Sequence, residues 1–197
     1  MSSVPLMFQP LVKYVDFQGR SRRSEFWLWV LFRILVGAVM GTIATSFMLT
    51  GINLNSHNPE QFMGRYLQIM PVFSLINLGL LLPSLAVGVR RLHDINRTGW
   101  WLVMPIVVAF AGMILFFIVF GSQFFTLLGS EGQMSDAQTA QFVFQMLGSM
   151  FLCLFLPILI SQIVMLVFYV TDGTPGPNRF GSDPKGRGLP ATPEVMF

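Results

Sequence analysis

The sequence has little charge, a single cysteine and few histidines. Charged residues make up 11% of the 197 residues, where a soluble domain usually has about 25%. The single cysteine, Cys153, excludes an internal disulfide framework and a cysteine-cluster metal site, and two histidines are too few for a histidine-rich metal site. The chain also lacks a phosphate-binding loop, a serine-nucleophile turn and a zinc-protease helix motif. We therefore predict no catalytic residues, no metal and no cofactor.

The chain is rich in apolar residues instead. Hydrophobic residues make up 53% of it, including 20 Phe and 13 Met. A water-soluble globule of this size could not bury so much apolar surface, and disordered chains are polar and rich in charge. The composition favours an integral membrane protein.

Four long apolar segments can each cross a bilayer as a helix, which takes about 20 mostly apolar residues. They run from about Phe26 to Thr50, Leu67 to Val89, Trp100 to Phe120 and Phe142 to Val170. The segments are too long and too continuous for membrane strands, whose apolar and polar residues alternate. We predict an all-α membrane protein with a four-helix transmembrane domain over residues 26–170.

The positions of the basic residues predict the orientation. Ten of the twelve Lys and Arg precede the first segment, follow the fourth, or lie between the second and third. The opposite loops, Gly51–Tyr66 and Gly121–Gln141, contain a single Lys or Arg residue, which is Arg65. Because cytoplasmic loops of membrane proteins collect Lys and Arg, we predict that both termini are cytoplasmic. The same rule explains the net charge of +3 without nucleic acid, which we do not expect as a partner.

The two ends of the chain are predicted to differ in structure. Residues 1–25 form a cytoplasmic segment in which Leu6–Phe17 mixes apolar and charged residues, as a short stretch lying on the inner leaflet would. A disordered tail is the alternative. Residues 171–197 are rich in Gly and Pro and are predicted to be an irregular cytoplasmic tail.

Two segments that precede apolar runs resemble each other. Arg23–Leu28 and Arg97–Leu102 both read Arg, a hydroxyl residue, any residue, an aromatic residue, Trp and Leu. Two helical hairpins related as a parallel repeat would give this pattern. We favour convergence, because any helix that enters from the cytoplasm benefits from Arg near the headgroups and Trp at the interface.

Three polar clusters lie on the predicted cytoplasmic side, at Gly19–Trp27, Arg90–Trp101 and Thr171–Pro184. Each adjoins a membrane helix, so we expect them to lie together at one end of a small bundle. The candidate site residues in them are Arg20, Arg23, Glu25, Arg90, Arg91, His93, Asp94, Arg97, Asp172, Asn178 and Asp183.

In these clusters the chain resembles the domain-of-unknown-function 805 family of bacterial inner-membrane proteins. The resemblance is carried by Gly-Arg-x-x-Arg-x-Glu-Phe-Trp at Gly19–Trp27, by Arg-Arg-Leu-His-Asp…Gly-Trp-Trp at Arg90–Trp101, and by Gly-Pro-Asn-x-Phe-Gly-x-Asp-Pro at Gly176–Pro184. It covers roughly Leu11–Pro184. The resemblance implies an inner-membrane location and a helical fold, and it supplies no settled activity and no catalytic role.

The connector residues have three possible roles. Arg90 and Asp94 are four apart and could pair on one helix face, while Arg91 could bind a lipid phosphate or Glu25. We favour a structural role, in which these side chains satisfy helix ends and loops. A phosphate or headgroup site and a catalytic site are the alternatives.

The acidic residues of the tail could hold it against the bundle. Asp172 and Asp183 could pair with arginines of the other clusters and fold the tail back as a cap. A hydrated Mg²⁺ held by Asp94, Asp172 and Asp183 is possible in principle, although nothing in their spacing requires it.

Arg33 is the one basic residue inside an apolar segment. At its depth the guanidinium could reach the cytoplasmic headgroups or pair inside the bundle, and we favour either role over transport. No apolar helix carries an acidic residue, which argues against a proton-coupled transporter. The Gly37–Gly41 spacing is a weak indication of a homo-oligomer.

Two functions remain. We favour a non-catalytic scaffold or interaction module whose basic cytoplasmic face contacts a membrane protein partner or anionic lipids. The alternative is a membrane enzyme or transporter that acts on a small or lipid-linked phosphate compound and uses Arg23, Arg91 and His93.

Overall fold

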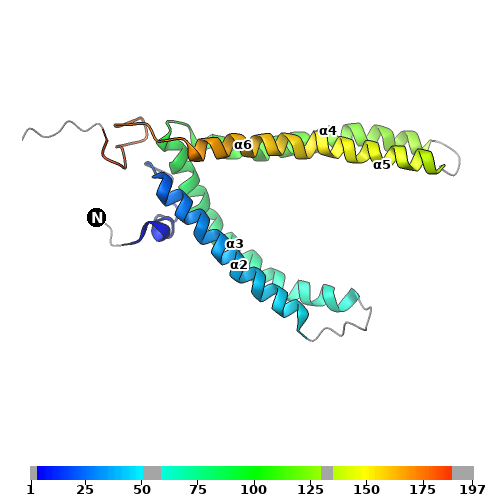
Figure 1. The fold of residues 1–197 in the computed structure, drawn as a ribbon, viewed down its shortest axis with the longest axis horizontal. Helices are drawn as coiled ribbons and strands as arrows, with labels where there is room; N and C mark the ends of the chain where they lie inside the picture. The colour runs from blue at the N-terminus through cyan, green and yellow to red at the C-terminus, as the bar shows by residue number, and fades with distance from the viewer. Residues whose placement is uncertain (1–3, 51–58, 130–134, 188–197) are drawn as a thin grey trace, which may run out of the picture. The chain divides into compact units, whose positions relative to one another are not determined.

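The computed structural model describes residues 4–50, 59–129 and 135–187, and within them the chain forms helices and no β-strand (Figure 1). Much of the predicted loop Gly51–Tyr66 and part of Gly121–Gln141 lie outside these residues. The helices are α1 (Gln9–Val12) after a 3₁₀ turn η1 (Leu6–Phe8), α2 (Arg23–Leu49), α3 (Pro59–Asp94), a 3₁₀ turn η2 (Gly99–Val103), α4 (Met104–Leu128), α5 (Asp136–Met150), a π-helical turn η3 (Phe151–Phe155) and α6 (Leu156–Val170).

Four helical stretches are long and apolar enough to cross a membrane, which confirms the predicted fold class. They are Arg23–Leu49, Met63–Asp94, Gly99–Ser122 and Asp136–Val170, the last made of α5, η3 and α6. The helices are longer than the predicted apolar segments. Hydropathy indicates which residues can lie in the hydrocarbon core, and it does not indicate where a helix begins or ends.

Local signals explain why the helices extend into the predicted outer loops. Pro59 occupies the first position of α3, where a missing amide hydrogen costs nothing. Ser135 and Gln138 form a capping box at the start of α5, in which each side chain bonds the other residue's amide.

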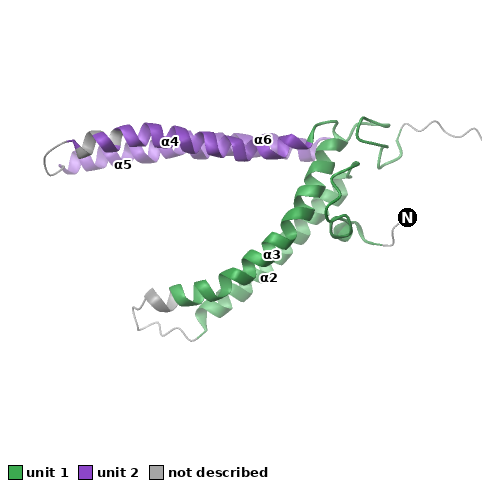
Figure 2. Ribbon diagram, turned by 180° about the vertical axis from the view of Figure 1, so that it is seen from behind, with its two compact units in different colours: residues 1–98, 172–197 green, residues 99–171 purple. Residues whose placement is uncertain are grey.

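The chain divides into two compact units (Figure 2). Unit 1 contains the described residues up to Thr98 and from Asp172 onward, and unit 2 contains Gly99–Thr171. In unit 1, α2 and α3 lie side by side as a hairpin, and Trp29 of α2 donates to Ser84 Oγ of α3 over 3.1 Å.

The N-terminal segment of unit 1 is folded against this hairpin. The rings of Phe8 and Phe32 pack edge to face with centroids 5.6 Å apart, and Pro10 of α1 is buried. The Tyr14 hydroxyl donates to the carbonyl of Gly79 in α3. The segment is therefore ordered from Leu6 through Tyr14, and its position on the inner leaflet remains a prediction.

Unit 2 is a hairpin of α4 against α5, η3 and α6. Pro157 has no amide hydrogen to donate to the carbonyl of Cys153 four residues earlier, and the helix takes a π turn at this place. Gly112 of α4 packs on that carbonyl, because a Cβ there would lie 2.2 Å from the Cys153 oxygen. Small size at position 112 therefore permits the close approach of the two helices.

Candidate functional site

The three polar clusters come together within unit 1, and we call residues 16–25, 90–97 and 172–187 the polar cap. A C-terminal Schellman motif ends α3 there: Asn96 is left-handed with φ 58°, and the amides of Arg97 and Asn96 donate to the carbonyls of Leu92 and His93. This turn satisfies the last carbonyls of α3 and fixes the direction of the connector.

Asp94, the last residue of α3, lies at the centre of the cap. Its Oδ1 is 3.0 Å from both Nε and Nη2 of Arg20, and its Oδ2 accepts from Arg91 Nη1 over 2.7 Å. The side chains of all three residues are at most 4% exposed. Hydrogen bonds between ionised groups are about twice as strong as neutral ones, so this buried triad joins the start of the chain to α3.

Arg20 also holds the tail. Its Nη2 donates to the carbonyl of Thr174 over 2.6 Å and its Nη1 to that of Gly176 over 2.7 Å. The amide of Thr174 in turn donates to the Asp94 carbonyl over 2.9 Å. Gly173 packs so closely that a Cβ there would lie 2.0 Å from Asp94 Oδ2, which only glycine avoids.

A second buried ion pair joins α3 to the start of α2. Arg90 Nη2 lies 3.1 Å from Glu25 Oε1, and Arg90 Nη1 donates to the Asp16 carbonyl over 3.1 Å. Glu25 is in the first turn of α2, where an acidic side chain is also favoured by the helix dipole. Two buried atoms of this region, Ser21 Oγ and Arg90 Nε, have no hydrogen-bond partner among the described residues.

The tail carries further ion pairs, one around the buried Asp183 side chain and one around the more exposed Asp172. Burial would raise the pKa of Asp183, but hydrogen bonds from the Lys185 amide and from the Arg187 side chain and amide, with the charge of Arg187, lower it to about 2. Asp172 is more exposed and lies 2.9 Å from Arg23 Nη2 and 3.4 Å from Lys185 Nζ.

His93 and Asn178 complete the cap through packing and backbone bonds. The His93 ring stacks on Phe180 with centroids 3.9 Å apart, and its Nδ1 lies 3.2 Å from the Gly19 carbonyl. Asn178 Nδ2 donates to the His93 carbonyl over 3.0 Å. The one titratable ring in the cap is thus held by contacts on both sides.

The interior of the cap is formally neutral. The buried side chains are those of Arg20, Arg90, Arg91, Glu25, Asp94 and Asp183. The exposed basic residues of the cap are Arg22, Arg97, Arg179 and Lys185, and together with the exposed Lys13, which precedes the cap in sequence, we call them the outer basic surface. Asp16 and Asp172 are the exposed acidic residues in the same part of the described chain. The charge of this end is therefore paired inside and positive outside.

The structure rearranges the expected pairs. Arg90 and Asp94 do not pair, because Arg90 faces α2 and binds Glu25. Asp94 instead binds Arg91, three residues earlier on the helix, and Arg20. Both spacings put two side chains on one face of a helix, and Glu25 of α2 and Arg20, which precedes α2, decide between them.

The remaining candidates have varied environments. Asp172 binds Arg23, and Asp183 lies 4.0 Å from Arg20 Nη2, so the tail carboxylates do meet arginines of another cluster. Arg97 is exposed, and its amide caps α3. Among the described residues, no group of three or more His, Cys, Asp or Glu side chains is placed to hold a metal ion.

Sequence reasoning missed several residues of the cap. Gly173, Thr174, Phe180 and Arg187 all make contacts that hold the tail. The turn-forming Gly and Pro of the tail indicated irregular structure. The backbone carbonyls that accept hydrogen bonds from Arg20 could not be predicted, because every residue has a carbonyl group.

Arg33 of α2 hydrogen-bonds to α3 inside the hairpin. Its Nη1 donates to Ser84 Oγ over 2.9 Å and to the Leu80 carbonyl over 3.4 Å, both on α3. No carboxylate among the described residues forms a salt bridge with Arg33.

Comparisons with known proteins agree with this picture. The model of the family described as "Protein of unknown function (DUF805)" matches residues 14–182. The chain is 29% identical over 176 residues to the inner membrane protein YhaI of Escherichia coli (strain K12), covering 89% of this chain and 91% of that protein. It is 27% identical over 175 residues to the inner membrane protein YhaH of the same organism, covering 89% and 92%. No solved structure matches the chain. These relatives and the four candidate spans place the chain in the bacterial inner membrane.

Proposed function

Since the chain belongs to the DUF805 family of proteins of unknown function, we propose that it is a non-catalytic scaffold of the inner membrane. The polar cap faces the cytoplasm, and its outer basic surface contacts an anionic partner. That partner is an acidic surface of another protein or the headgroups of anionic lipids.

One observation carries the proposal: the separation of charge in the cap. The buried arginines are bound to carboxylates and carbonyls of the chain itself, so they serve the fold. The outer basic surface is exposed, and a partner would meet its positive charge first. Exposed positive charge beside a membrane attracts anionic surfaces and weakens in salt.

The same observation disfavours an enzyme or transporter built on Arg23, Arg91 and His93. Arg91 is fully buried and bonded to Asp94, so a phosphate compound would have to displace that carboxylate. His93 is stacked on Phe180, and Arg23 is paired with Asp172. Each of these groups is thus engaged by another part of the chain.

The proposal is tested with the full chain in nanodiscs of zwitterionic phosphatidylcholine. Wild type is mixed with liposomes of phosphatidylglycerol, with liposomes of phosphatidylcholine, and with a poly-glutamate peptide. We expect salt-sensitive binding to at least one acidic probe and none to phosphatidylcholine. Neutralising Lys13, Arg97 and Arg179 to Gln should abolish most of that binding.

Arg65→Gln is the matched control for Arg97→Gln, because it removes an equal charge from the opposite end of α3. Arg97→Gln should weaken binding and Arg65→Gln should not. Binding of neither acidic probe, or equal binding by wild type and the triple variant, would contradict the proposal. Binding of liposomes alone or peptide alone identifies the partner class.

A further inference from the structure

Arg33 carries a charge inside the α2–α3 hairpin and has no counter-charge there. It lies ten residues into α2, about 15 Å along the helix from Arg23. Both of its hydrogen bonds use Nη1 and go to neutral oxygens, those of Ser84 and Leu80. Nε and Nη2 have no partner among the described residues. A lone intramembrane cation is costly and marks a functional position by default.

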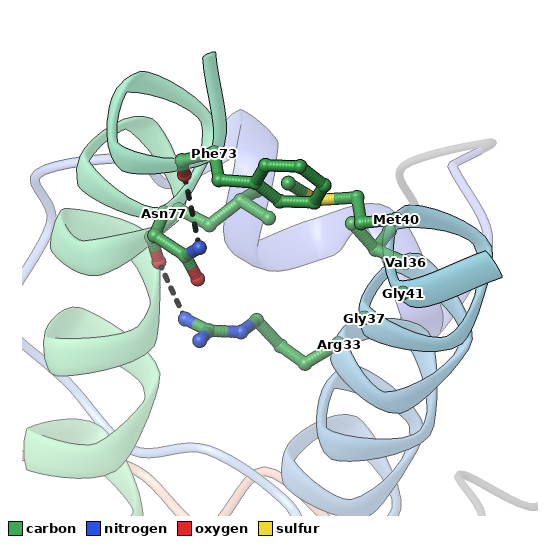
Figure 3. A pocket seen from close by; sticks show the side chains of 8 residues that line it. Arg33, Val36, Gly37, Met40, Gly41, Phe73 and Asn77 are labelled. Carbon is green, nitrogen blue, oxygen red and sulfur yellow. Dashed lines mark hydrogen bonds between the residues drawn. The ribbon is translucent and has the colours of Figure 1, made fainter. Parts of the chain in front are cut away.

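The guanidinium borders a cavity between the two helices. The cavity has a volume of about 300 Å³. Figure 3 shows Arg33 reaching in from α2 and Asn77 from α3, with Met40 and Phe73 at the far end. Gly37 lines the α2 side, and a Cβ at Gly37 would meet no atom within 4 Å. The cavity thus has one cation in its wall without a counter-charge, and free space beside Gly37.

The cavity continues into an apolar one. A second cavity of about 260 Å³ shares Met40 and Phe73 with the first and extends to Ile43, Phe47 and Ile76. Its walls are almost entirely apolar. Together the two cavities, which we call the hairpin groove, place Arg33 at one end and apolar walls beyond it, up to Phe47, whose carbonyl accepts from Arg65 Nη1 over 2.7 Å.

We propose that the hairpin groove binds an anionic amphiphile, with its oxyanion on Arg33 and its acyl chain along Met40, Phe73 and Phe47. The Nε and Nη2 edge of a guanidinium presents two parallel N–H donors, which match a phosphate or a carboxylate. The oxyanion is therefore that of a phospholipid or of a fatty acid.

The direction of the groove agrees with the predicted orientation of the chain. From Arg33 to Phe47, α2 runs away from the end that carries the polar cap. With that end in the cytoplasm, an acyl chain that follows the groove from Arg33 points away from the cytoplasmic side, as the chains of inner-leaflet lipids do. The site lies in the membrane helices, apart from the outer basic surface of the proposed function.

The test uses the full chain in phosphatidylcholine nanodiscs doped with phosphatidylglycerol in one arm and with oleate in the other. Native mass spectrometry of the released protein counts the lipids that it retains. Wild type should retain one anionic molecule per chain in at least one arm. Arg33→Gln should lower the retained fraction about tenfold or more, since it removes two charge-assisted hydrogen bonds. Asp136→Asn removes an exposed charge of unit 2, outside the groove and outside the outer basic surface, and should change nothing.

Gly37→Leu is a second variant that keeps the charge and fills the cavity. It should lose the anionic molecule even though Arg33 is present, so the test does not depend on how well Arg33→Gln folds. Retention of phosphatidylglycerol alone identifies a phosphate, and retention of oleate alone identifies a carboxylate. Wild-type retention no better than that of Arg33→Gln and Gly37→Leu, or equal retention of phosphatidylcholine, would overturn the proposal. Gly37→Leu keeps the whole outer basic surface, so a molecule that this variant loses is held by the groove and not by that surface, and the two proposals fail separately.

Discussion

Units 1 and 2 are both helical hairpins, but different interactions hold them. Every salt bridge between described residues lies in unit 1. The described part of unit 2 contains a single charged residue, Asp136, and its helices pack through apolar contacts such as Phe120 with Phe142, 5.5 Å apart. Ion pairs depend on the identity and position of each partner, whereas apolar packing depends on volume. The two units should therefore respond to different kinds of substitution.

The largest effect is expected from Asp94→Asn in unit 1. The variant keeps the size of the side chain and removes the charge that Arg20 and Arg91 share. Removing one partner of a buried ion pair costs about 3–5 kcal/mol. Hydrogen exchange at the Thr174 amide, which donates to the Asp94 carbonyl, measures the cost as easier opening of the tail.

Asp136→Asn is the matched control for this variant, because it removes the same charge from the exposed start of α5. It should leave exchange at Thr174 unchanged. If Asp94→Asn also leaves this exchange unchanged, the buried ion network does not hold the tail, and the contrast between the units disappears.

In unit 2 the most sensitive position is expected to be Gly112. Gly112→Ala places a Cβ 2.2 Å from the backbone oxygen of Cys153, which cannot rotate away, so the helices must separate. Overpacking of this kind costs about 1–3 kcal/mol. The apparent Tm, followed by far-ultraviolet circular dichroism in detergent, should fall.

Gly148→Ala is the control, since a Cβ at Gly148 of α5 meets no atom within 4 Å. Helix propensity favours alanine there. Equal Tm values for the two variants would mean that α4 and the π turn do not pack as closely as described.

These contrasts show what the sequence could predict. The apolar runs predicted the four spans, because the thickness of the bilayer sets how many apolar residues a spanning helix needs. The polar residues adjoining the helices indicated that charge would gather at one end. The pairing of Arg90 with Glu25, and of Asp94 with Arg20 and Arg91, depends on how the segment before α2 and the first turn of α2 pack on α3, and no local pattern specifies that packing.

The same limit applies in unit 2. Pro157 in an apolar run predicts a disturbed helix. Whether the helix kinks, or takes a π turn that offers its carbonyl to Gly112, depends on the neighbouring helix. Arg33 is the opposite case, since its charge in an apolar segment identified it without any knowledge of the cavity beside it.

A pH dependence should be confined to unit 1. The pKa of Asp183 is lowered to about 2 in the folded tail from 3.8, so its ionised form favours the folded state. That contribution is complete above about pH 4 and is lost as the pH falls toward 2. Pepsin cleavage of the tail should accelerate over this range, and Asp183→Asn should remove the acceleration. A wild-type tail cleaved at a constant rate from pH 4 to 2 would argue against this ion pair.

The smallest effect is expected from Asp172→Asn. This variant tests whether the burial of the ion pairs, and not charge alone, stabilises the tail of unit 1 against opening. The Asp172 side chain is 59% exposed and binds Arg23 and Lys185, themselves more than one third exposed. Exposed pairs contribute about 0–1 kcal/mol and weaken in salt, so the variant should barely change exchange at Thr174. Asp94 and Asp172 each lie within reach of two cations, yet only Asp94 has been removed from water. A loss as large as that of Asp94→Asn would show that the number of ion pairs, and not their burial, separates the two units.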